Sequence, residues 1–243
     1  MKSRLADVTH CSVAGLLFDY GGTLDGPASH WLDRFAGFYR AACVELPFDE
    51  LRHAFYRADE AAYAEPRVAG MSLRELMEFH VAVQLDELSL RRPDLQAHLV
   101  DRFLEETTEA LRASCRILTA LSPHYRLGVV SNFYGNVGRI LQDAGFGSLL
   151  SVVIDSNAVG LSKPDPAIYT LAIDELRTTA ARTMHVGDSY ERDVCAAHAA
   201  GLRTAWLVGE RPPRIAGGDC VADFCLRSLD DLIIVLDRPM ARS

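Results

Sequence analysis

Residues 13–24 read VAGLLFDYGGTL, a short apolar run that ends at Asp19 and is followed by two glycines. A continuous apolar run of this length, bounded by a turn signal, is typical of a strand buried on both faces. The glycine pair predicts a tight turn directly after that strand. The segment therefore predicts a buried strand that places Asp19 at the end of a sheet.

A similar pattern returns after about residue 116, where short apolar runs alternate with helical periodicity. Strands are predicted at residues 127–130, 150–154, 183–186 and 204–208, and helices at about 134–144, 166–176, just before 201 and 229–236. Strands that alternate with helices of about 10–15 residues indicate βαβ units and a parallel sheet. Since the first strand is needed to complete this sheet, we predict an α/β fold with a Rossmann-like parallel core.

The stretch between the first and second strands carries four amphipathic helical patterns and no strand. Apolar side chains recur there at helical spacing, as at Trp31, Phe35 and Phe38. We therefore predict a four-helix insertion at residues 27–113, and a catalytic core made of residues 1–26 and 114–243.

The composition excludes several classes of protein. The 243 residues are 49% hydrophobic and 24% charged, which is ordinary globular usage. The net charge of −8 and the absence of a basic stripe disfavour nucleic acid and anionic membranes as partners. No apolar run approaches the ~20 residues of a membrane span, and no secretory signal is recognisable. The six cysteines form no C-x-x-C pair and are interpreted as reduced residues of a cytoplasmic protein. The sequence carries no signal for an oligomeric state.

Chemically active side chains gather at the predicted carboxyl ends of the strands, where open parallel sheets bind their ligands. Asp19, Ser131, Lys163, Asp188 and Asp193 come from four places in the chain to this rim. Three carboxylates at one rim repel each other unless a cation neutralises them, and Mg²⁺ suits carboxylates, waters and substrate oxygens. The hydroxyl and the ammonium group would then face a doubly charged anion, for which phosphate is the natural candidate.

Four segments, taken in order, resemble the motifs of the haloacid dehalogenase superfamily. They are residues 17–24 (LFDYGGTL), 129–132 (VVSN), 162–166 (SKPDP) and 187–193 (GDSYERD). Each motif alone is weakly specific, but four in order, each after an independently predicted strand, form a strong signal. The resemblance covers about residues 13–236 and implies that the inserted helices form a cap between motifs one and two.

The resemblance implies a role for each matching residue. Asp19 would be the nucleophile that takes the phosphoryl group as an aspartyl-phosphate, later hydrolysed by water. Ser131 would donate a hydrogen bond to the phosphoryl oxygens, and Lys163 would link nucleophile and phosphoryl group electrostatically. The implied substrate-binding positions are Gly22, Thr23 and Asn132, with a turn role left open for the last.

The metal site is also implied by the resemblance. Mg²⁺ would be held by Asp19, the backbone carbonyl of Gly21 and Asp188, with Asp193 as a ligand or behind the ligands. Phosphatases of the family usually carry a second aspartate, the general acid and base, at the position of Gly21. A backbone carbonyl survives this change but a proton donor does not, so Asp25 and His30 are considered as alternative acids.

The resemblance leaves several functions open. A phosphonate hydrolase of the family needs a cap lysine, and residues 27–113 contain none. A haloacid dehalogenase needs no metal and usually lacks the aspartate found at Asp188, so this activity is disfavoured. The leading interpretation is a Mg²⁺-dependent hydrolase of a small phosphorylated metabolite, favouring good leaving groups because of Gly21. The alternative from another class is a catalytically impaired phosphate-binding or interaction protein. The sequence does not identify the substrate.

Overall fold

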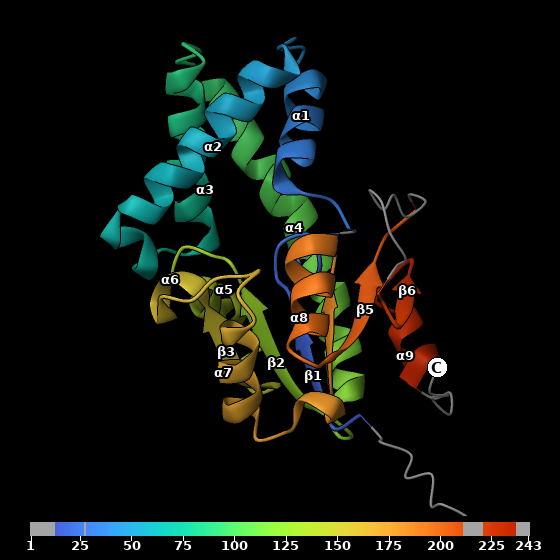
Figure 1. The fold of residues 1–243 in the computed structure, drawn as a ribbon. Coiled ribbons are helices and arrows are strands. Elements are labelled where there is room, and N and C mark those ends of the chain that lie inside the picture. The colour runs from blue at the N-terminus through green and yellow to red at the C-terminus, as the bar shows by residue number, and fades with distance from the viewer. Residues whose placement is uncertain (1–12, 27, 211–220, 237–243) are drawn as a thin grey trace, which may run out of the picture.

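The computed structural model describes residues 13–26, 28–210 and 221–236, and its centre is a parallel sheet (Figure 1). Within the described residues the sheet has six strands in the order β3-β2-β1-β4-β5-β6, and every pair of neighbours is parallel. The strands are β1 (Gly15–Phe18), β2 (Arg126–Ser131), β3 (Leu150–Asp155), β4 (Thr183–Gly187), β5 (Arg203–Leu207) and β6 (Phe224–Leu226). This confirms the predicted α/β, Rossmann-like parallel sheet. The short strand β6 is an addition to the prediction.

Strand β1 is apolar throughout because it lies in the middle of the sheet. It pairs with β2 on one side and β4 on the other, and helices cover both faces. Leu17 packs with α7 (Ala167–Leu176) and α8 (Ala196–Ala199), whereas Leu16 and Phe18 pack in the larger cluster on the opposite face. Alternate side chains of a strand point to opposite faces, so a strand covered on both faces must be apolar at every position.

Four helices separate β1 from β2 along the chain. They are α1 (Trp31–Ala41), α2 (Phe48–Ala64), α3 (Leu73–Glu87) and α4 (Pro93–Leu121), with a 3-10 turn, η1 (Pro66–Gly70), between α2 and α3. Figure 1 shows α1, α2, α3 and the first part of α4 beyond the carboxyl ends of the strands, and we call this group the helical block. The last part of α4 runs alongside the sheet, so the boundary predicted between residues 113 and 114 lies inside one continuous helix.

The remaining helices belong to the core, where all but the last, α9, lie between strands along the chain. They are α5 (Val137–Asp143), α6 (Ser156–Val159), α7, the 3-10 turn η2 (Ala180–Arg182), the π-helical turn η3 (Tyr190–Cys195), α8 and α9 (Asp231–Leu236). Among the described helices, none is long and apolar enough to cross a membrane. The helices of the block are stabilised mainly by packing of their apolar faces against one another. For example, the ring of Phe35 in α1 stacks on that of Phe103 in α4, with 5.4 Å between the ring centroids.

A buried ion pair joins the helical block to the loop after β1. Arg34 of α1 lies 3.7 Å from the Asp25 carboxylate, donates to Thr107 Oγ1 at 2.7 Å and sits 4.2 Å above the Phe103 ring. Asp25 also accepts from the indole of Trp31 at 2.6 Å. Since all of these groups are buried, each depends on the others for compensation of its lost hydration.

Asp25→Ala is expected to lower the free energy of unfolding by about 3–5 kcal/mol, because it leaves the Arg34 charge and two N–H donors buried without their acceptor. Urea unfolding followed by circular dichroism measures this. Asp101→Ala is the matched control, since it removes an exposed carboxylate paired with Arg74 and should change stability little. Equal effects of the two substitutions would contradict the anchoring role of Asp25.

Candidate active site

The structure brings the predicted catalytic side chains together at the carboxyl ends of β1, β2 and β4. The ammonium group of Lys163 lies 2.7 Å from Asp19 Oδ1 and 2.6 Å from Asp193 Oδ1. Ser131 Oγ donates to Asp19 Oδ1 at 2.9 Å. Asp19 is 7% exposed and Lys163 is 4% exposed, so these groups interact in surroundings with little water. Two distant segments of the chain, carrying Ser131 and Lys163, therefore converge on the Asp19 carboxylate.

Asn132 holds the loop that carries Lys163. Its Nδ2 donates to the Lys163 carbonyl oxygen and its Oδ1 accepts from the Lys163 amide, both at 2.8 Å. This pair of bonds clamps the lysine backbone against the end of β2. Asn132 thus has a positioning role, and the substrate contact considered for it stays a prediction.

Three carboxylates form the acidic part of the site. Oxygen atoms of Asp19, Asp188 and Asp193 lie within 4.8 Å of one another. Two glycines allow this approach: a Cβ at Gly22, where φ is +77°, would lie 2.5 Å from Asp188 Oδ2, and a Cβ at Gly187 would lie 2.3 Å from Asp193 Cγ. The structure therefore gives Gly22, predicted as a substrate-binding position, a steric role beside Asp188.

Charges in the site differ in how well they are compensated. Burial raises the pKa of Asp193, but the charge of Lys163 and the bond from His185 outweigh it and hold that pKa below its ordinary range. Burial lowers the pKa of Lys163, but Asp19 and Asp193 more than offset this. Burial raises the pKa of Asp188 well above its usual value, and the charges of Asp19 and Asp193 raise it further. Lys163 and Asp193 therefore form an ion pair, whereas Lys163 only partly compensates the charge of Asp188.

The donor set fits Mg²⁺. The group offers three carboxylates at close range, and the ionised form of one of them, Asp188, would be stabilised by a further cation. Hard oxygen ligands of this kind are those that Mg²⁺ prefers. Asp193 already accepts from Lys163, His185 and the Ser189 amide, so Asp19 and Asp188 have the greater freedom to bind an ion. The backbone carbonyl of Gly21 and the buried Thr23 hydroxyl remain predicted contacts.

The two alternative proton donors differ in availability. Asp25 is fully buried, and its two carboxylate oxygens accept from the Gly22 amide at 2.7 Å and from the Trp31 indole. It is therefore committed to holding the loop and is a poor candidate for the acid. His30 is exposed at the start of α1, and its Nδ1 accepts from the Leu32 amide at 3.2 Å, which leaves Nε2 for other contacts.

Sequence reasoning missed two positioning residues of the site. His185, in β4, lies 3.1 Å from Asp193 Oδ1 through Nε2, and Trp206, in β5, donates from its indole to the Asp188 carbonyl at 2.9 Å. The sequence pattern places both residues only within predicted strands. A histidine within an otherwise apolar strand, two residues before a glycine and an aspartate, is the signal that could have identified the first of them.

The order of the four motifs along this fold agrees with a comparison of the chain with known families. The profile of haloacid dehalogenase-like hydrolases matches residues 13–201. The chain belongs to this family. All four motif segments fall within the match.

Individual relatives share parts of the chain. It is 35% identical over 133 residues to haloacid dehalogenase-like hydrolase domain-containing protein 3 from Bos taurus, a match to 54% of this chain. That match covers 51% of the relative, so the chain spans about half of its length. Pyrophosphatase PpaX from Listeria welshimeri is 28% identical over 231 residues, 92% of this chain and 96% of PpaX.

Solved structures share the fold. The HAD-hydrolase YfnB from Bacillus subtilis, bound to magnesium, superimposes with a TM-score of 0.59 at 18% identity, covering 93% of this chain and 100% of that one. A dehalogenase with an intermediate complex gives a TM-score of 0.65 at 19% identity, covering 93% and 98%. At these identities the similarity shows the fold alone and does not identify the reaction.

Proposed function

We propose that this protein is a Mg²⁺-dependent phosphoryl hydrolase that acts on a small phosphorylated metabolite through an aspartyl-phosphate on Asp19. The observation that carries the proposal is the way Asp19 is held. Lys163 and Ser131 both donate to its Oδ1. We assign the other oxygen, Oδ2, as the attacking atom. Oxygen atoms of two further carboxylates, which suit a metal ion, lie within 4.8 Å of an Asp19 oxygen.

In the proposed reaction, Oδ2 of Asp19 attacks phosphorus, and the bond from phosphorus to the leaving oxygen breaks with its electron pair on that oxygen. Water then attacks the phosphorus of the aspartyl-phosphate, which releases phosphate and restores the carboxylate. Lys163 stabilises the negative charge that gathers on the phosphoryl oxygens, and Ser131 orients them. Mg²⁺, held by Asp19 and Asp188, with Gly21 and Asp193 as further predicted contacts, would supply charge neutralisation and polarise the phosphoryl group.

Gly21 bears on the class of substrate. Without a carboxylic acid at this position, a leaving group that is already a stable anion is the easier one to expel. The likeness to PpaX, whose name describes a pyrophosphatase, supports this preference because phosphate is such a leaving group. We therefore propose that acyl phosphates, diphosphates or aryl phosphates are turned over better than alkyl phosphates.

The helical block is proposed to act as the cap of the site, with residues 27–113 as cap and residues 1–26 and 114–243 as core. Its place beyond the carboxyl ends of the strands supports this (Figure 1). A cytoplasmic location is also proposed. The four cysteines in the described residues are free thiols, which is the ordinary state in a reducing compartment.

Removal of the metal is expected to stop hydrolysis of an aryl phosphate, and added Mg²⁺ should restore it. Asp188→Ala should raise the Mg²⁺ concentration for half-maximal rate at least ~10-fold, because it deletes one of the proposed ligands. Asp174→Ala, which removes an exposed carboxylate of α7, is the matched control and should leave this concentration unchanged. Full activity in EDTA, with halide released from a 2-haloacid, would move the assignment to a dehalogenase.

A second candidate function rests on Gly21 alone. If loss of the acid has ended turnover, the protein would bind phosphate without hydrolysing it. A metal fluoride that mimics the phosphoryl group would then bind with Mg²⁺ and raise the melting temperature, while no phosphate ester or diphosphate is consumed. This candidate is excluded if any of these substrates is turned over and the turnover is lost in Asp19→Asn.

A further inference from the structure

A chain of hydrogen-bonded side chains crosses the helical block and ends on the core. The Tyr39 hydroxyl donates to Gln84 Oε1 at 3.3 Å, and Gln84 Nε2 donates to His80 Nδ1 at 2.8 Å. His80 Nε2 then lies 3.1 Å from Asp59 Oδ1. The same oxygen accepts from the hydroxyl of Tyr134, a residue of the core. Four elements, α1, α3, α2 and the loop after β2, are thereby linked.

The direction of the donors makes Asp59 the end of this chain. Because Gln84 donates to Nδ1 of His80, the ring carries its hydrogen on Nε2 and donates to Asp59. His80 and Gln84 are fully buried, whereas the Asp59 side chain is 21% exposed. A carboxylate that accepts two such donors forms charge-assisted hydrogen bonds, which are stronger than neutral ones. The block therefore presents one rigidly held acceptor to Tyr134.

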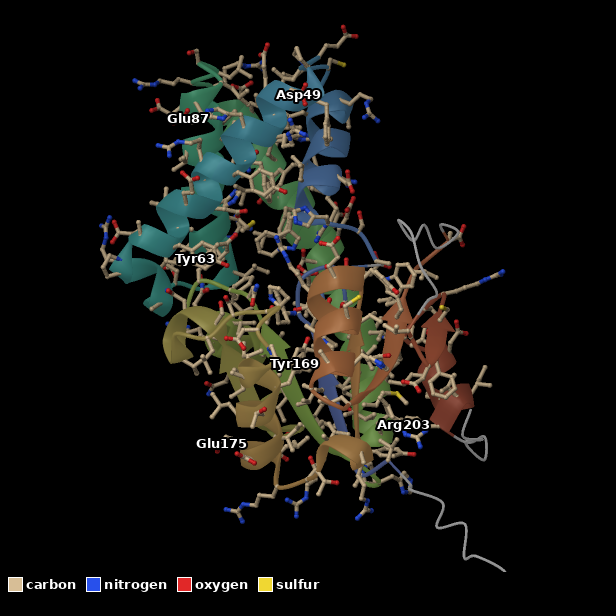
Figure 2. All side chains as sticks on the ribbon, in the orientation of Figure 1. Asp49, Tyr63, Glu87, Tyr169, Glu175 and Arg203 are labelled. Atoms are coloured by element: carbon tan, nitrogen blue, oxygen red, sulfur yellow. The ribbon has the colours of Figure 1, made fainter. Side chains whose placement is uncertain are left out.

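Tyr134 lies in the loop that carries the phosphate-binding motif, three residues after Ser131. Two further bonds join this part of the core to the segment between α2 and α3. Asn136 Nδ2, in the same loop, donates to the Met71 carbonyl at 3.0 Å, and Arg139 Nη1, in α5, donates to the Gly70 carbonyl at 3.1 Å. Figure 2 shows Tyr63 at the end of α2 that lies nearest the core, and its ring packs 4.7 Å from that of Tyr134. The same loop thus carries proposed substrate-binding residues and contacts the helical block.

The block is attached to the core in two different ways. On the side where the chain passes between core and block lie the covalent connections and the Asp25–Arg34 pair. This pair can stay intact while substrate enters or leaves. On the other side the contacts are between separate segments, and Tyr134 to Asp59 is a side-chain bond to a charged group there. An element anchored at one side and bonded reversibly at the other can open and close about the anchored side.

We propose that Tyr134 and Asp59 form a clasp that holds the helical block closed over Asp19, and that Tyr134 is a positioning residue for the hydrolysis. This inference rests on the proposed function for its effect on turnover, but the clasp itself is a property of the fold. A closed block excludes water from the nucleophile and keeps Ser131 and Asn132 in place around the substrate. The clasp therefore sets the fraction of molecules that are ready to react.

Tyr134→Phe tests the clasp because it removes one hydroxyl and keeps the ring that packs against Phe133 and Tyr63. Loss of one charge-assisted hydrogen bond should shift the balance between open and closed forms roughly 10-fold. We expect KM for an aryl phosphate to rise by at most that factor, because KM follows the closed fraction of the free protein, with a smaller change in kcat. Asp59→Asn keeps an oxygen acceptor but loses the charge, so its KM should lie between those of the wild type and Tyr134→Phe. Asp59→Leu, which removes the acceptor, should resemble Tyr134→Phe. Tyr56→Phe is the control, because it removes the hydroxyl of an exposed tyrosine in α2, the helix that carries Asp59.

A distance measurement tests the clasp without turnover. Spin labels at Asp49→Cys on the block and Glu175→Cys on the core, in a chain whose own cysteines are serines, span the molecule from end to end (Figure 2). With Mg²⁺ and inorganic phosphate, the wild type should give a narrow distribution and Tyr134→Phe a broader one. If the two distributions coincide, the clasp is wrong even where the protein proves to be a phosphatase. If the distributions differ but no phosphate compound is hydrolysed, the clasp stands and the proposed function fails.

Discussion

Asp19→Asn is expected to lower kcat for an aryl phosphate at least ~10³-fold, the loss typical of removing one member of a covalent catalytic unit. The amide keeps the shape of the carboxylate and an oxygen that can accept from Ser131 and Lys163, so the local structure should survive. What it loses is the anionic oxygen that attacks phosphorus and one charge toward the metal. Steady-state kinetics at saturating Mg²⁺ measures the effect.

Two further measurements make this result specific. Asp174→Asn makes the same chemical change on an exposed face of α7 and should retain full activity. Acid quenching during turnover should trap labelled phosphate on the wild-type protein and none on Asp19→Asn. Retention of more than a few per cent of wild-type kcat by Asp19→Asn would show that the covalent mechanism is incorrect.

Convergence of the catalytic side chains could be predicted from the sequence because two simple rules combine. Apolar runs locate the strands, and parallel strands place their carboxyl ends at one edge. Asp19, Ser131 and Asp188 each follow such a run directly, and the structure brings them to one rim. Lys163 stands out for a different reason, since the chain otherwise uses arginine almost throughout.

Element boundaries were less accessible. Helix α4 continues from Pro93 to Leu121, serving the block with one part and the sheet with another. Helical periodicity shows where an apolar stripe lies but not which partner covers it, so it gives no sign of a domain boundary near residue 113. Strand β6, only three residues long at the edge of the sheet, is too short for a pattern to reveal.

Individual hydrogen-bond partners outside the group of catalytic side chains could not be predicted. Asp25 and His30 look equally suitable as acids when judged by their distance along the chain from Asp19. Only the structure shows that the carboxylate of Asp25 is occupied by the Gly22 amide and the Trp31 indole. In the same way, 75 residues separate Asp59 from Tyr134, and nothing in either local pattern predicts their bond.

Position 21 is expected to control the dependence of rate on the leaving group. In the wild type, kcat/KM should fall steeply from aryl phosphates to alkyl phosphates, because an alkoxide leaves poorly without a proton donor. Gly21→Asp should raise kcat/KM for an alkyl phosphate by ~10²–10⁴-fold, the usual contribution of a positioned general acid, and change the rate for aryl phosphates much less. A series of phosphate esters with graded leaving-group pKa measures both slopes.

The space around position 21 is sufficient for the side chain of Gly21→Asp, so we expect this substitution to restore the general acid rather than to disrupt the site by steric clashes. Among the residues that the structure describes, none apart from the chain neighbours has an atom within 4 Å of a Cβ placed there. The adjacent glycine provides the contrast, since a Cβ at Gly22 would meet Asp188 Oδ2 at 2.5 Å on a backbone with φ of +77°. Gly22→Ala should therefore disrupt the arrangement of the three carboxylates Asp19, Asp188 and Asp193, and abolish turnover of substrates with any leaving group. A shallow slope in the wild type would mean that another residue, with His30 the available one, already supplies the proton, and the argument from Gly21 would fail.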